Sequence, residues 1–271
     1  MILKTRTAVI LARGLGKRMR RDDAGIQLDE AQARAASAGM KGMIPIRRPF
    51  LEYSMSALAD AGYERVCLVV GPEHGEVQSH FTSNVHPVRI EIDFAIQHEP
   101  KGTADAVLAA EELVGHENFV VLNSDNYYPA SALSLLRNAE APAVVGFARS
   151  AVVKSGVPED RVARFGALDF DSSGFLTSIV PRPGGSPAAH DGEVYSSMNC
   201  WLFTPQIFEA CRKVDMSPRG ELELPRAVQL AIDTMGMKMR VIRVAEPVLD
   251  LSTREDVRQV QSLLADITPS L

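Results

Sequence analysis

Short runs of apolar residues alternate with segments of helix length through the first half of this 271-residue chain, and this alternation restricts its fold most. The runs lie at 7–12, 66–71, 119–122 and 143–148. Runs of this length, bounded by glycine or polar residues, are typical of strands buried on both faces. Because such strands are separated by helices, the pattern predicts an α/β fold with a parallel sheet covered on both sides.

Helical patterns fill the segments between these runs. Residues 50–61 place apolar side chains on one helical face and are followed by Gly62, a residue type that commonly ends helices. Thr103 is predicted to be the N-cap of a helix that extends through Val114. A further strand is expected over 89–96, where apolar and polar residues partly alternate.

The second half of the chain has more strand character. Two apolar runs within 165–180 flank the turn sequence Asp-Ser-Ser-Gly and predict a β-hairpin. Residues 194–203 are expected to form one strand. Near the end of the chain, Ser252 and Glu255 have the spacing of a capping box, which predicts a helix over 252–266.

Composition limits the partners and the compartment. The chain has 29 Lys and Arg against 34 Asp and Glu, a formal net charge of −5, which argues against a general nucleic-acid-binding surface. Its three cysteines stand in apolar surroundings without metal-ligand spacing, as buried thiols in a reducing compartment do. The apolar run near the N-terminus is too short to span a bilayer. We therefore expect a cytoplasmic protein with no signal peptide, no membrane segment and no nucleic-acid partner.

The strongest local motif is Leu-Ala-Arg-Gly-Leu-Gly-Lys-Arg-Met at 11–19, directly after the first predicted strand. Glycines allow a backbone to approach a phosphate chain closely, and lysine and arginine neutralise its charge. A dinucleotide-binding fingerprint would need glycine in place of Met19, and a P-loop would need serine or threonine in place of Arg18. The motif therefore predicts a site for a small polyanion; the alternative is a charged strand-to-helix turn.

Two aspartates follow apolar strands in distant parts of the chain. Asp125 comes after the run 119–122, and Asp250 comes after another apolar stretch much later in the sequence. The carboxyl ends of strands in an open α/β sheet are where ligands bind. A Mg²⁺ ion that bridges phosphates is commonly held by one or two carboxylates. Either aspartate alone could form a turn or cap a helix, but together with the glycine motif they predict a Mg²⁺ site.

These motifs, in this order, resemble those of the sugar-1-phosphate nucleotidyltransferases, also called nucleoside diphosphate sugar pyrophosphorylases. The resemblance extends along nearly the whole chain. It includes the nucleotide-binding signature at 11–19, the lysine-and-proline element at 41–46, the Gln…Gly-Thr-Ala base-binding loop at 97–104, the metal aspartate motif at 124–126, and Phe165-Gly166, Asn199, Arg219-Gly220-Glu221 and Asp250. The order and number of the motifs carry the resemblance.

The resemblance implies an α/β fold with a Rossmann-like, mixed and mainly parallel sheet flanked by helices, and a smaller β-rich sugar-binding lobe, as in glycosyltransferases of the A type. It implies a single domain over 1–271, with a nucleotide-binding part over about 1–150, a sugar-binding part over about 151–250 and a C-terminal helix over 252–266. The substrates would be a nucleoside triphosphate and a sugar 1-phosphate, with Mg²⁺ as cofactor. A homo-oligomer is an open option.

The resemblance also implies roles for matching positions of this chain. The catalytic residues would be Arg18, Lys41 and Asp125. The nucleotide-binding residues would be Ala12, Gly14, Gly16, Lys17, Gln97, Gly102 and Thr103. The sugar-binding residues would be Gly166, Arg182 and Asn199. Asp125 and Asp250 would bind Mg²⁺.

The chain departs from the family pattern in several places. Arg13 replaces a usual glycine, and residues 20–40 form an unmatched segment that we interpret as a mobile loop with a short helix, a candidate lid. Pro181-Arg182-Pro183 occupies the place of a Glu-Lys-Pro element whose glutamate would bind sugar hydroxyls. This replacement argues against ordinary hexose recognition. Arg182 could still neutralise the sugar phosphate, with a geometry unlike that of lysine.

The expected reaction transfers a nucleoside monophosphate: a sugar phosphate oxygen attacks the α-phosphorus of the triphosphate, and pyrophosphate leaves. UTP or dTTP is favoured, because the base-binding loop and the chain length most resemble those branches of the family. Guanylyl transfer to mannose 1-phosphate is the main enzymatic alternative. A second hypothesis is a non-catalytic nucleotide-sugar sensor, in view of Arg13, Ser124 and Pro181. Pyrophosphate release with a panel of substrates distinguishes the two hypotheses.

Overall fold

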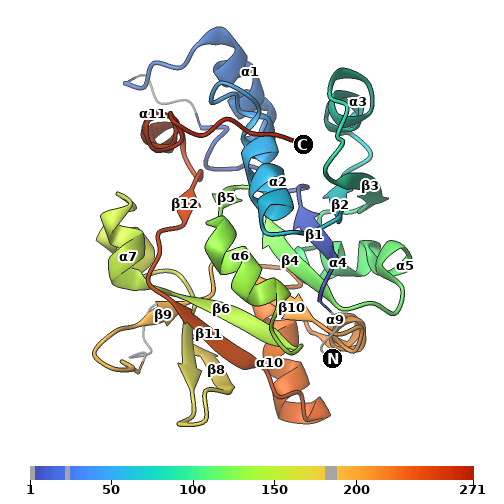
Figure 1. Cartoon of the computed structure of the whole chain (residues 1–271), viewed down its shortest axis with the longest axis vertical. Helices are drawn as coiled ribbons and strands as arrows, with labels where there is room; N and C mark the ends of the chain where they lie inside the picture. Colours follow the sequence, from blue (N-terminus) through green and yellow to red (C-terminus); the bar gives the residue numbers. More distant parts are fainter. Residues whose placement is uncertain (1–3, 22–24, 181–187) are drawn as a thin grey trace.

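One mixed sheet of ten strands runs through the protein in this computed structural model, which describes residues 4–21, 25–180 and 188–271 (Figure 1). The strands lie in the order β3-β2-β1-β4-β10-β6-β9-β7-β8, and β11 pairs with β6 outside this path. Their bounds are β1 (Thr7–Leu11), β2 (Arg65–Val70), β3 (Glu91–Ile96), β4 (Phe119–Asn123), β6 (Ala143–Ala148), β7 (Ala167–Phe170), β8 (Leu176–Val180), β9 (Tyr195–Ser196), β10 (Trp201–Phe203) and β11 (Arg240–Val244). A separate two-stranded sheet consists of β5 (Asn126–Tyr127) and β12 (Leu249–Asp250).

The first half of the chain forms the parallel core of the large sheet. β1 lies between β2 and β4, and β3 pairs with the other edge of β2, all in parallel. β10 inserts antiparallel between β4 and β6, so the sheet is mixed, and its second half is largely antiparallel. The strands expected at 7–12, 66–71, 119–122 and 143–148 are β1, β2, β4 and β6. The predicted α/β class is confirmed.

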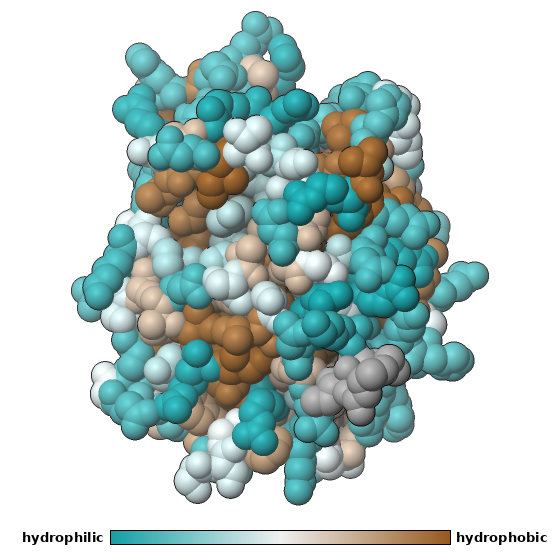
Figure 2. All heavy atoms as spheres, viewed as in Figure 1, coloured by the Kyte–Doolittle hydropathy of each residue, from teal (hydrophilic) through white to brown (hydrophobic). Residues whose placement is uncertain are grey.

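Helices cover both faces of the sheet. Their bounds are α1 (Glu30–Ala38), α2 (Phe50–Asp60), α3 (Gly75–Ser79), α4 (Thr103–Ala109), α5 (Glu111–Val114), α6 (Ala130–Arg137), α7 (Arg149–Lys154), α8 (Glu159–Val162), α9 (Ile207–Lys213), α10 (Leu224–Met235) and α11 (Arg254–Leu263), with the short 3₁₀ helix η1 (Lys41–Met43) and the π-helix η2 (His80–Asn84). None of the helices in the described ranges is long and apolar enough to cross a membrane. Polar side chains cover most of the face shown in Figure 2, where apolar ones gather in several separate patches, one of them over β6 and β11.

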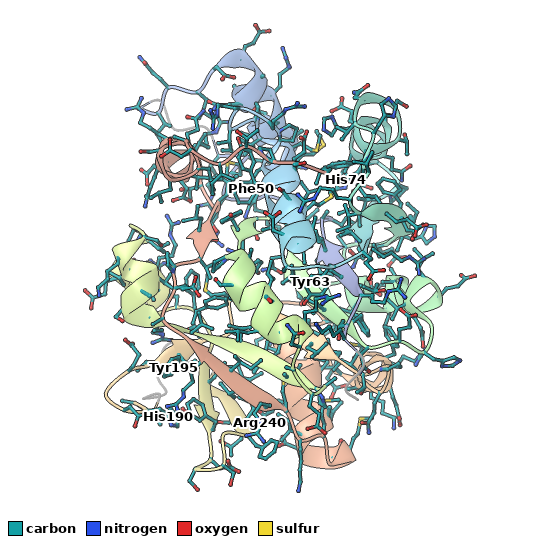
Figure 3. The ribbon with its side chains drawn as sticks, viewed as in Figure 1. Phe50, Tyr63, His74, His190, Tyr195 and Arg240 are labelled. Carbon is teal, nitrogen blue, oxygen red and sulfur yellow. The ribbon has the colours of Figure 1, made fainter. Side chains whose placement is uncertain are left out.

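Alternate residues of the central strand face the two helical layers, as the period of a β-strand requires. Ala8 and Ile10 of β1 pack with α2 and α6 on one face, whereas Val9 and Leu11 pack with α4, α9 and α10 on the other. Figure 1 shows α2 and α6 on the near side of the sheet and α10 behind it. Tyr63, just after α2, donates its buried hydroxyl to a backbone carbonyl of α6 at 3.1 Å (Figure 3).

A third apolar cluster lies outside these two layers and joins segments that are distant in sequence. Its buried members are Met19, Ala35, Ala36, Ile44, Ile46, Phe50, Tyr53, Leu249, Leu251, Val257, Val260 and Leu264. Phe50 contributes from the start of α2 (Figure 3). The helix expected within 20–40 is α1, and it packs into this third cluster together with α11. The described part of the unmatched segment is thus held against the body of the protein.

The strand expected over 194–203 is interrupted. β9 and β10 are separated by Met198 and Asn199, whose φ angles of 45° and 55° are left-handed and incompatible with a strand. The backbone stays in line with β6 nevertheless, because the amide of Val145 donates to the carbonyl of Cys200 at 3.0 Å. The interruption turns Asn199 out of the strand pleat, and apolar patterning gives no signal for such a break.

Two predicted helix starts are wrong by one residue. Gly102, not Thr103, is the N-cap of α4, and the hydroxyl of Thr103 instead accepts a hydrogen bond from the amide of Leu224 at 2.8 Å. The helix expected through Val114 is divided into α4 and α5 at Ala110. Thr103 is recruited by a distant helix, which local sequence cannot indicate.

The capping box of α11 uses Thr253 and Asp256 rather than Ser252 and Glu255. The carboxylate of Asp256 accepts from the amide of Thr253 at 2.7 Å, and it also accepts from Nη1 of Arg161 at 2.9 Å. The buried ion pair with Arg161 explains why the carboxylate at 256 takes this place, since Glu255 is exposed. The observed helix is correspondingly shorter than the predicted 252–266.

The β-rich second half continues the large sheet. β7 and β8 form the predicted hairpin, and β7 pairs with β9, which joins the hairpin to β6. The side chain of Gln229 on α10 accepts from the amide of Ile179 at 3.0 Å and donates to the carbonyl of Thr177 at 3.3 Å. It thereby satisfies backbone groups at the edge of β8 that a further strand would otherwise pair.

Asp256→Ala is expected to lower the free energy of unfolding by about 2–4 kcal/mol, because it removes a helix cap and leaves the Arg161 guanidinium without its closer partner. Glu255→Ala is the matched control and should change the free energy by less than about 0.5 kcal/mol, because Glu255 is exposed. Urea titrations of both variants provide the comparison. A larger loss for Glu255→Ala would place the cap where the sequence alone predicts it.

Candidate active site

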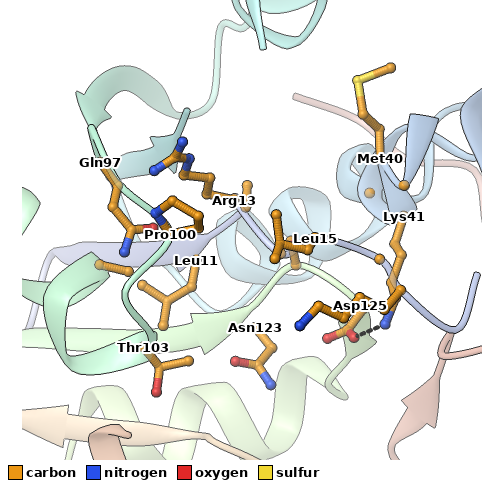
Figure 4. Close-up of a pocket in the computed structure, with 18 of the residues that line it drawn as sticks. Leu11, Arg13, Leu15, Met40, Lys41, Gln97, Pro100, Thr103, Asn123 and Asp125 are labelled. Atoms are coloured by element: carbon orange, nitrogen blue, oxygen red, sulfur yellow. Dashed lines mark hydrogen bonds and ion pairs between the residues drawn. The ribbon is translucent and has the colours of Figure 1, made fainter. Parts of the chain in front are cut away.

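A pocket of about 650 Å³ opens at the carboxyl ends of β1, β3 and β4 (Figure 4). It is lined by Leu11 to Arg18, Lys41, Gln97, Gly102, Thr103 and Asp125, among others. A second pocket adjoins it and is lined by Gly166, Asn199 and Asp250, among others. Four residues line both pockets: Arg18, Asn123, Asp125 and Arg219. The described residues predicted for the nucleotide, the sugar and the metal thus border one continuous space.

The glycine turn after β1 packs closely against the segment that precedes Lys41. A Cβ on Gly16 would lie 2.5 Å from the carbonyl oxygen of Gly39, and Gly16 has a φ of 58°. Gly14 has open space at the same position, with no atom within 4 Å. Gly16 therefore permits close packing against Gly39, whereas Gly14 leaves the backbone of the turn open towards the pocket.

Arg13 replaces the usual glycine without blocking this turn. Its guanidinium donates to the carboxylate of Glu73 through Nε and Nη2, each at 3.3 Å, and the side chain is 7% exposed. It lies against Gly71, where a Cβ would come within 2.5 Å of the Arg13 Nε. Nη1 is buried and has no hydrogen-bond partner in the described part of the chain. The side chain therefore packs at the end of β2, and the turn backbone remains accessible.

Lys41 and Asp125 form an ion pair where the two pockets meet. Nζ of Lys41 lies 2.8 Å from Oδ2 of Asp125 (Figure 4). Lys41 begins η1 and Asp125 directly precedes β5, so the pair joins the two segments next to the glycine turn. The side chains are 14% and 23% exposed, which leaves both charged groups reachable from the pocket.

Asp250 lies beside Asp125 because β12 pairs with β5. In this register Asp250 is opposite Asn126, and the amide of Leu251 donates to the carbonyl of Asp125 at 2.8 Å. Oδ1 of Asp250 accepts from Nδ2 of Asn126 at 3.2 Å and from the hydroxyl of Ser252 at 3.0 Å. Two acidic residues from distant parts of the chain are therefore held next to each other.

Burial, and after it the neighbouring Asp125 carboxylate, raise the pKa of Asp250 to about 6, while Lys41 opposes the shift. The shift reflects above all the cost of ionising a buried carboxylate, to which the nearby Asp125 carboxylate adds. No group of three or more His, Cys, Asp and Glu side chains in the described ranges could hold a metal ion. Two carboxylates nevertheless suit Mg²⁺, which commonly takes one or two protein oxygens and completes its octahedron with water and phosphate.

Arg161 contacts Asp250 from α8 and is absent from the sequence-based set of site residues. Its Nη1 lies 3.4 Å from Oδ2 of Asp250 and 2.9 Å from both carboxylate oxygens of Asp256. Arg161 thus links the acidic pair to the N-terminus of α11. No local pattern around Arg161 signals this contact, because its partners lie about ninety residues later.

Gln97 lies at the inner wall of the first pocket. Its Nε2 donates to the carboxylate of Asp105 at 2.7 Å and to the carbonyl of Gly102 at 3.1 Å. Gly102 has a φ of 132°, and a Cβ there would lie 2.4 Å from the carbonyl oxygen of Leu222. The amide of Leu222 donates to the carbonyl of Lys101 at 2.7 Å. The loop that contains Gly102 is therefore bonded to the segment before α10.

On the sugar side, Gly166 and Asn199 line the second pocket together with both aspartates. Arg149 supports the first of these positions, because its Nη2 donates to the carbonyl of Phe165 at 2.6 Å. Arg182 lies outside the described residues. Lys17 and Ala12 line the first pocket beside Gly14 and Gly16.

Arg219 is a residue to which the sequence analysis gives no separate role. It lines both pockets, as Arg18 does, and its Nη1 pairs with Glu223 at 3.3 Å. Its sequence signal is the Arg-Gly-Glu motif at 219–221, which belongs to the family resemblance. Two arginines therefore face the junction between the pockets.

Comparison with known protein families matches residues 36–266 to the family described as nucleotidyl transferase. The chain belongs to this family. It is thus a nucleotidyltransferase, as the ordered motifs predict.

Relatives cover almost the whole chain. It is 28% identical over 262 residues to the UTP–glucose-1-phosphate uridylyltransferase AglF of Haloferax volcanii, a match that covers 96% of this chain and 97% of the relative. It is 28% identical over 268 residues to a glucose-1-phosphate thymidylyltransferase of Streptomyces antibioticus, covering 97% of this chain and 68% of that protein.

Solved structures share the fold. A UDP-glucose pyrophosphorylase complexed with UDP-glucose superposes with a TM-score of 0.72 at 17% identity, covering 97% of this chain and 100% of that one. A UTP-bound UGPase from Acinetobacter baumannii superposes with a TM-score of 0.70 at 19% identity, covering 98% and 95%. At these identities the likeness establishes the fold alone.

Gly16→Ala is expected to lower the free energy of unfolding by about 2 kcal/mol or more, because the added Cβ meets backbone atoms and the φ is left-handed. Gly14→Ala is the matched control, and its effect on unfolding should stay within about 0.5 kcal/mol. Chemical denaturation measures both. Equal stability of the two variants would contradict the described packing of Gly16 on Gly39.

Proposed function

We propose that this nucleotidyltransferase transfers a nucleoside monophosphate from a nucleoside triphosphate to a sugar 1-phosphate, giving a nucleoside diphosphate sugar and pyrophosphate. The observation that carries the proposal is the junction of the two pockets. Cationic groups and the Asp125–Asp250 pair lie there between a glycine turn and a separate pocket. Such a junction suits two phosphorylated substrates that meet end to end.

The proposed reaction needs positioning and charge neutralisation more than a protein nucleophile. A phosphate oxygen of the sugar 1-phosphate attacks the α-phosphorus in line and forms a new P–O bond. The bond between the α-phosphorus and its bridging oxygen breaks, and pyrophosphate leaves with that electron pair. Arg18 and Lys41 would neutralise the negative charge of the phosphates, while Gly14, Gly16, Lys17 and Ala12 would hold the triphosphate along the turn.

Asp125 and Asp250 would hold Mg²⁺. When bound, the ion would neutralise charge on the phosphate oxygens and fix their geometry. Lys41 would then be released in part from its ion pair with Asp125 and be available to the substrate. The resemblance to the sugar-1-phosphate nucleotidyltransferases implies this ion, and the two neighbouring carboxylates support its placement here.

The base would be read by Gln97, Gly102 and Thr103, and the sugar by Gly166, Asn199 and Arg182. We accordingly propose a nucleotide-binding part over about 1–150 and a sugar-binding part over about 151–250. UTP or dTTP is the favoured triphosphate, in line with the named activities of the Haloferax and Streptomyces relatives. Glucose 1-phosphate is the first acceptor to test for the same reason, although Pro181 stands where the family's sugar-binding glutamate is expected.

The direct test is a pyrophosphate-release assay with Mg²⁺, over a panel of nucleoside triphosphates and sugar 1-phosphates that includes mannose 1-phosphate. Turnover with UTP or dTTP is expected. Turnover with GTP and mannose 1-phosphate alone would favour guanylyl transfer. Tight binding of a nucleotide sugar without turnover of any pair would favour the sensor hypothesis and refute the proposal.

Asp125→Ala is expected to lower turnover by on the order of 10³-fold or more through loss of Mg²⁺ binding, with the fold retained. Asp266→Ala is the control, because Asp266 is exposed near the end of the chain. Steady-state kinetics and circular dichroism together check this expectation. Near-normal activity of the Asp125 variant would remove this residue from the site.

Lys41→Ala is expected to lower kcat by about 10²–10³-fold, because a preorganised positive charge at the reacting phosphate would be lost. Lys238→Ala, at an exposed lysine, should leave kcat unchanged. A thermal melt accompanies the kinetics. If Lys41→Ala changes only the melting temperature, the proposed catalytic role is refuted.

A further inference from the structure

The side-chain amide of Gln97 is held in one orientation. Nε2 donates to Oδ2 of Asp105 at 2.7 Å and to the carbonyl of Gly102 at 3.1 Å. An ionised carboxylate and a backbone carbonyl can only accept hydrogen bonds, so neither can face the amide oxygen favourably. A flip of the amide would place its oxygen against both of them. Asp105 and the Gly102 carbonyl therefore determine which side of the Gln97 amide holds the nitrogen and which holds the oxygen.

The amide oxygen of Gln97 is left as a free acceptor. Oε1 receives no hydrogen bond from any residue in the described part of the chain. It is also not one of the buried side-chain atoms that lack a partner. Gln97 lines the first pocket, and Figure 4 shows its side chain directed along the pocket wall towards Thr103. Oε1 of Gln97 is thus available to accept a hydrogen bond from a ligand bound at this wall of the pocket.

A donor stands beside this acceptor. The backbone N–H of Gly102 has no hydrogen-bond partner in the described ranges, and Gly102 also lines the pocket. Its carbonyl is already bonded to Gln97, so the two residues are adjacent. The wall therefore combines one fixed acceptor with one available donor.

The nucleobases differ in the groups that they would present to such a wall. Uracil and thymine carry a ring N–H next to a carbonyl oxygen, and guanine has the same pair on its larger ring. Cytosine and adenine have the reverse arrangement, a bare ring nitrogen next to an amino group. A fixed acceptor next to a donor matches the first group. With cytosine or adenine, the amide oxygen would face the bare ring nitrogen, so two acceptors would meet. The backbone N–H would face the amino group, so two donors would meet.

We propose that Asp105 determines the base selectivity of the site by fixing the amide of Gln97, so that the pocket accepts bases with a ring N–H beside a carbonyl and rejects cytosine and adenine. This inference rests on the proposed function, because it concerns the triphosphate of that reaction. Asp105 does not line the pocket, so it is a positioning residue that acts through Gln97. The carboxylate is the stronger of the two partners of Nε2, being charged and closer.

The test compares kcat/KM for UTP, dTTP, GTP, CTP and ATP in the wild-type protein and in Asp105→Asn. The wild type should prefer UTP to CTP by on the order of 10²–10⁴-fold. In Asp105→Asn the residue at 105 can donate as well as accept, so only the carbonyl of Gly102 still opposes a flip of the Gln97 amide. The UTP-to-CTP ratio should then fall by about tenfold or more.

Asp93→Asn is the matched control. Asp93 is a partly buried carboxylate that accepts a side-chain hydrogen bond from Arg65 outside either pocket. It should leave the UTP-to-CTP ratio unchanged, whatever it does to stability. A wild-type protein that uses CTP or ATP as well as UTP overturns the proposal. So does an Asp105→Asn variant that melts like the wild type and keeps the wild-type ratio.

Isothermal titration of UTP and CTP in the presence of Mg²⁺ separates this proposal from the proposed function, because it requires no turnover. If no sugar 1-phosphate supports pyrophosphate release, the proposed reaction fails. Preferential binding of UTP that is reduced in Asp105→Asn still supports the role of Asp105, and equal binding of UTP and CTP refutes it. Should Asp105→Asn fail to fold, Asp105→Ser takes its place, because it also removes the carboxylate that accepts from Nε2 of Gln97.

Discussion

The pairing of β5 with β12 is the contact on which the candidate active site depends. It is two residues long in each strand, yet it places Asp250 beside Asp125 from the other end of the chain. Burial makes Asp250 costly to ionise, and repulsion from the nearby Asp125 carboxylate adds to this cost, so the pKa of Asp250 is raised to about 6. Hydrogen bonds from Asn126 and Ser252 offset part of this cost. The fold thus assembles an acidic pair that becomes favourable when positive charge is supplied by Lys41, by an ion or by both.

The third apolar cluster supports the segments that carry the charged residues of the candidate active site. Met19 directly follows Arg18, Ile44 belongs to the turn after Lys41, and Leu249 and Leu251 flank Asp250. One small core therefore carries the backbones of the phosphate turn, the lysine element and the second aspartate. The unmatched segment 20–40 contributes α1 to this core. The buried alanines of α1 thus pack in the same core as the segments that carry Arg18, Lys41 and Asp250.

Sequence predicted the parts of the structure whose signals are local. The buried strands and the hairpin at 165–180 follow from apolar runs and turn residues, and Asp125 was expected at the carboxyl end of the sheet because it follows a buried strand. Contacts between distant segments decide the rest. Thr103 is not the N-cap of α4, because its hydroxyl accepts a hydrogen bond from the start of α10. Arg161 contacts Asp250 from α8, and no sequence motif around Arg161 indicates this contact. The break in the strand before Cys200 places Met198 and Asn199 at the second pocket. Apolar periodicity could not reveal it, because the break depends on backbone conformation.

The loop at 97–104 and the segment before α10 are bonded to each other, and this connects the walls of the two pockets. Leu222 exchanges backbone hydrogen bonds with Lys101 and Ala104, at 2.7 and 2.9 Å, while Gly102 has no side chain because the carbonyl of Leu222 occupies that space. The same segment carries Arg219, which lines both pockets. The loop that would read the base therefore cannot shift without moving the arginine at the junction or breaking these bonds. In the proposed reaction, selection of the base and placement of charge at the reacting phosphates would therefore depend on one connected wall.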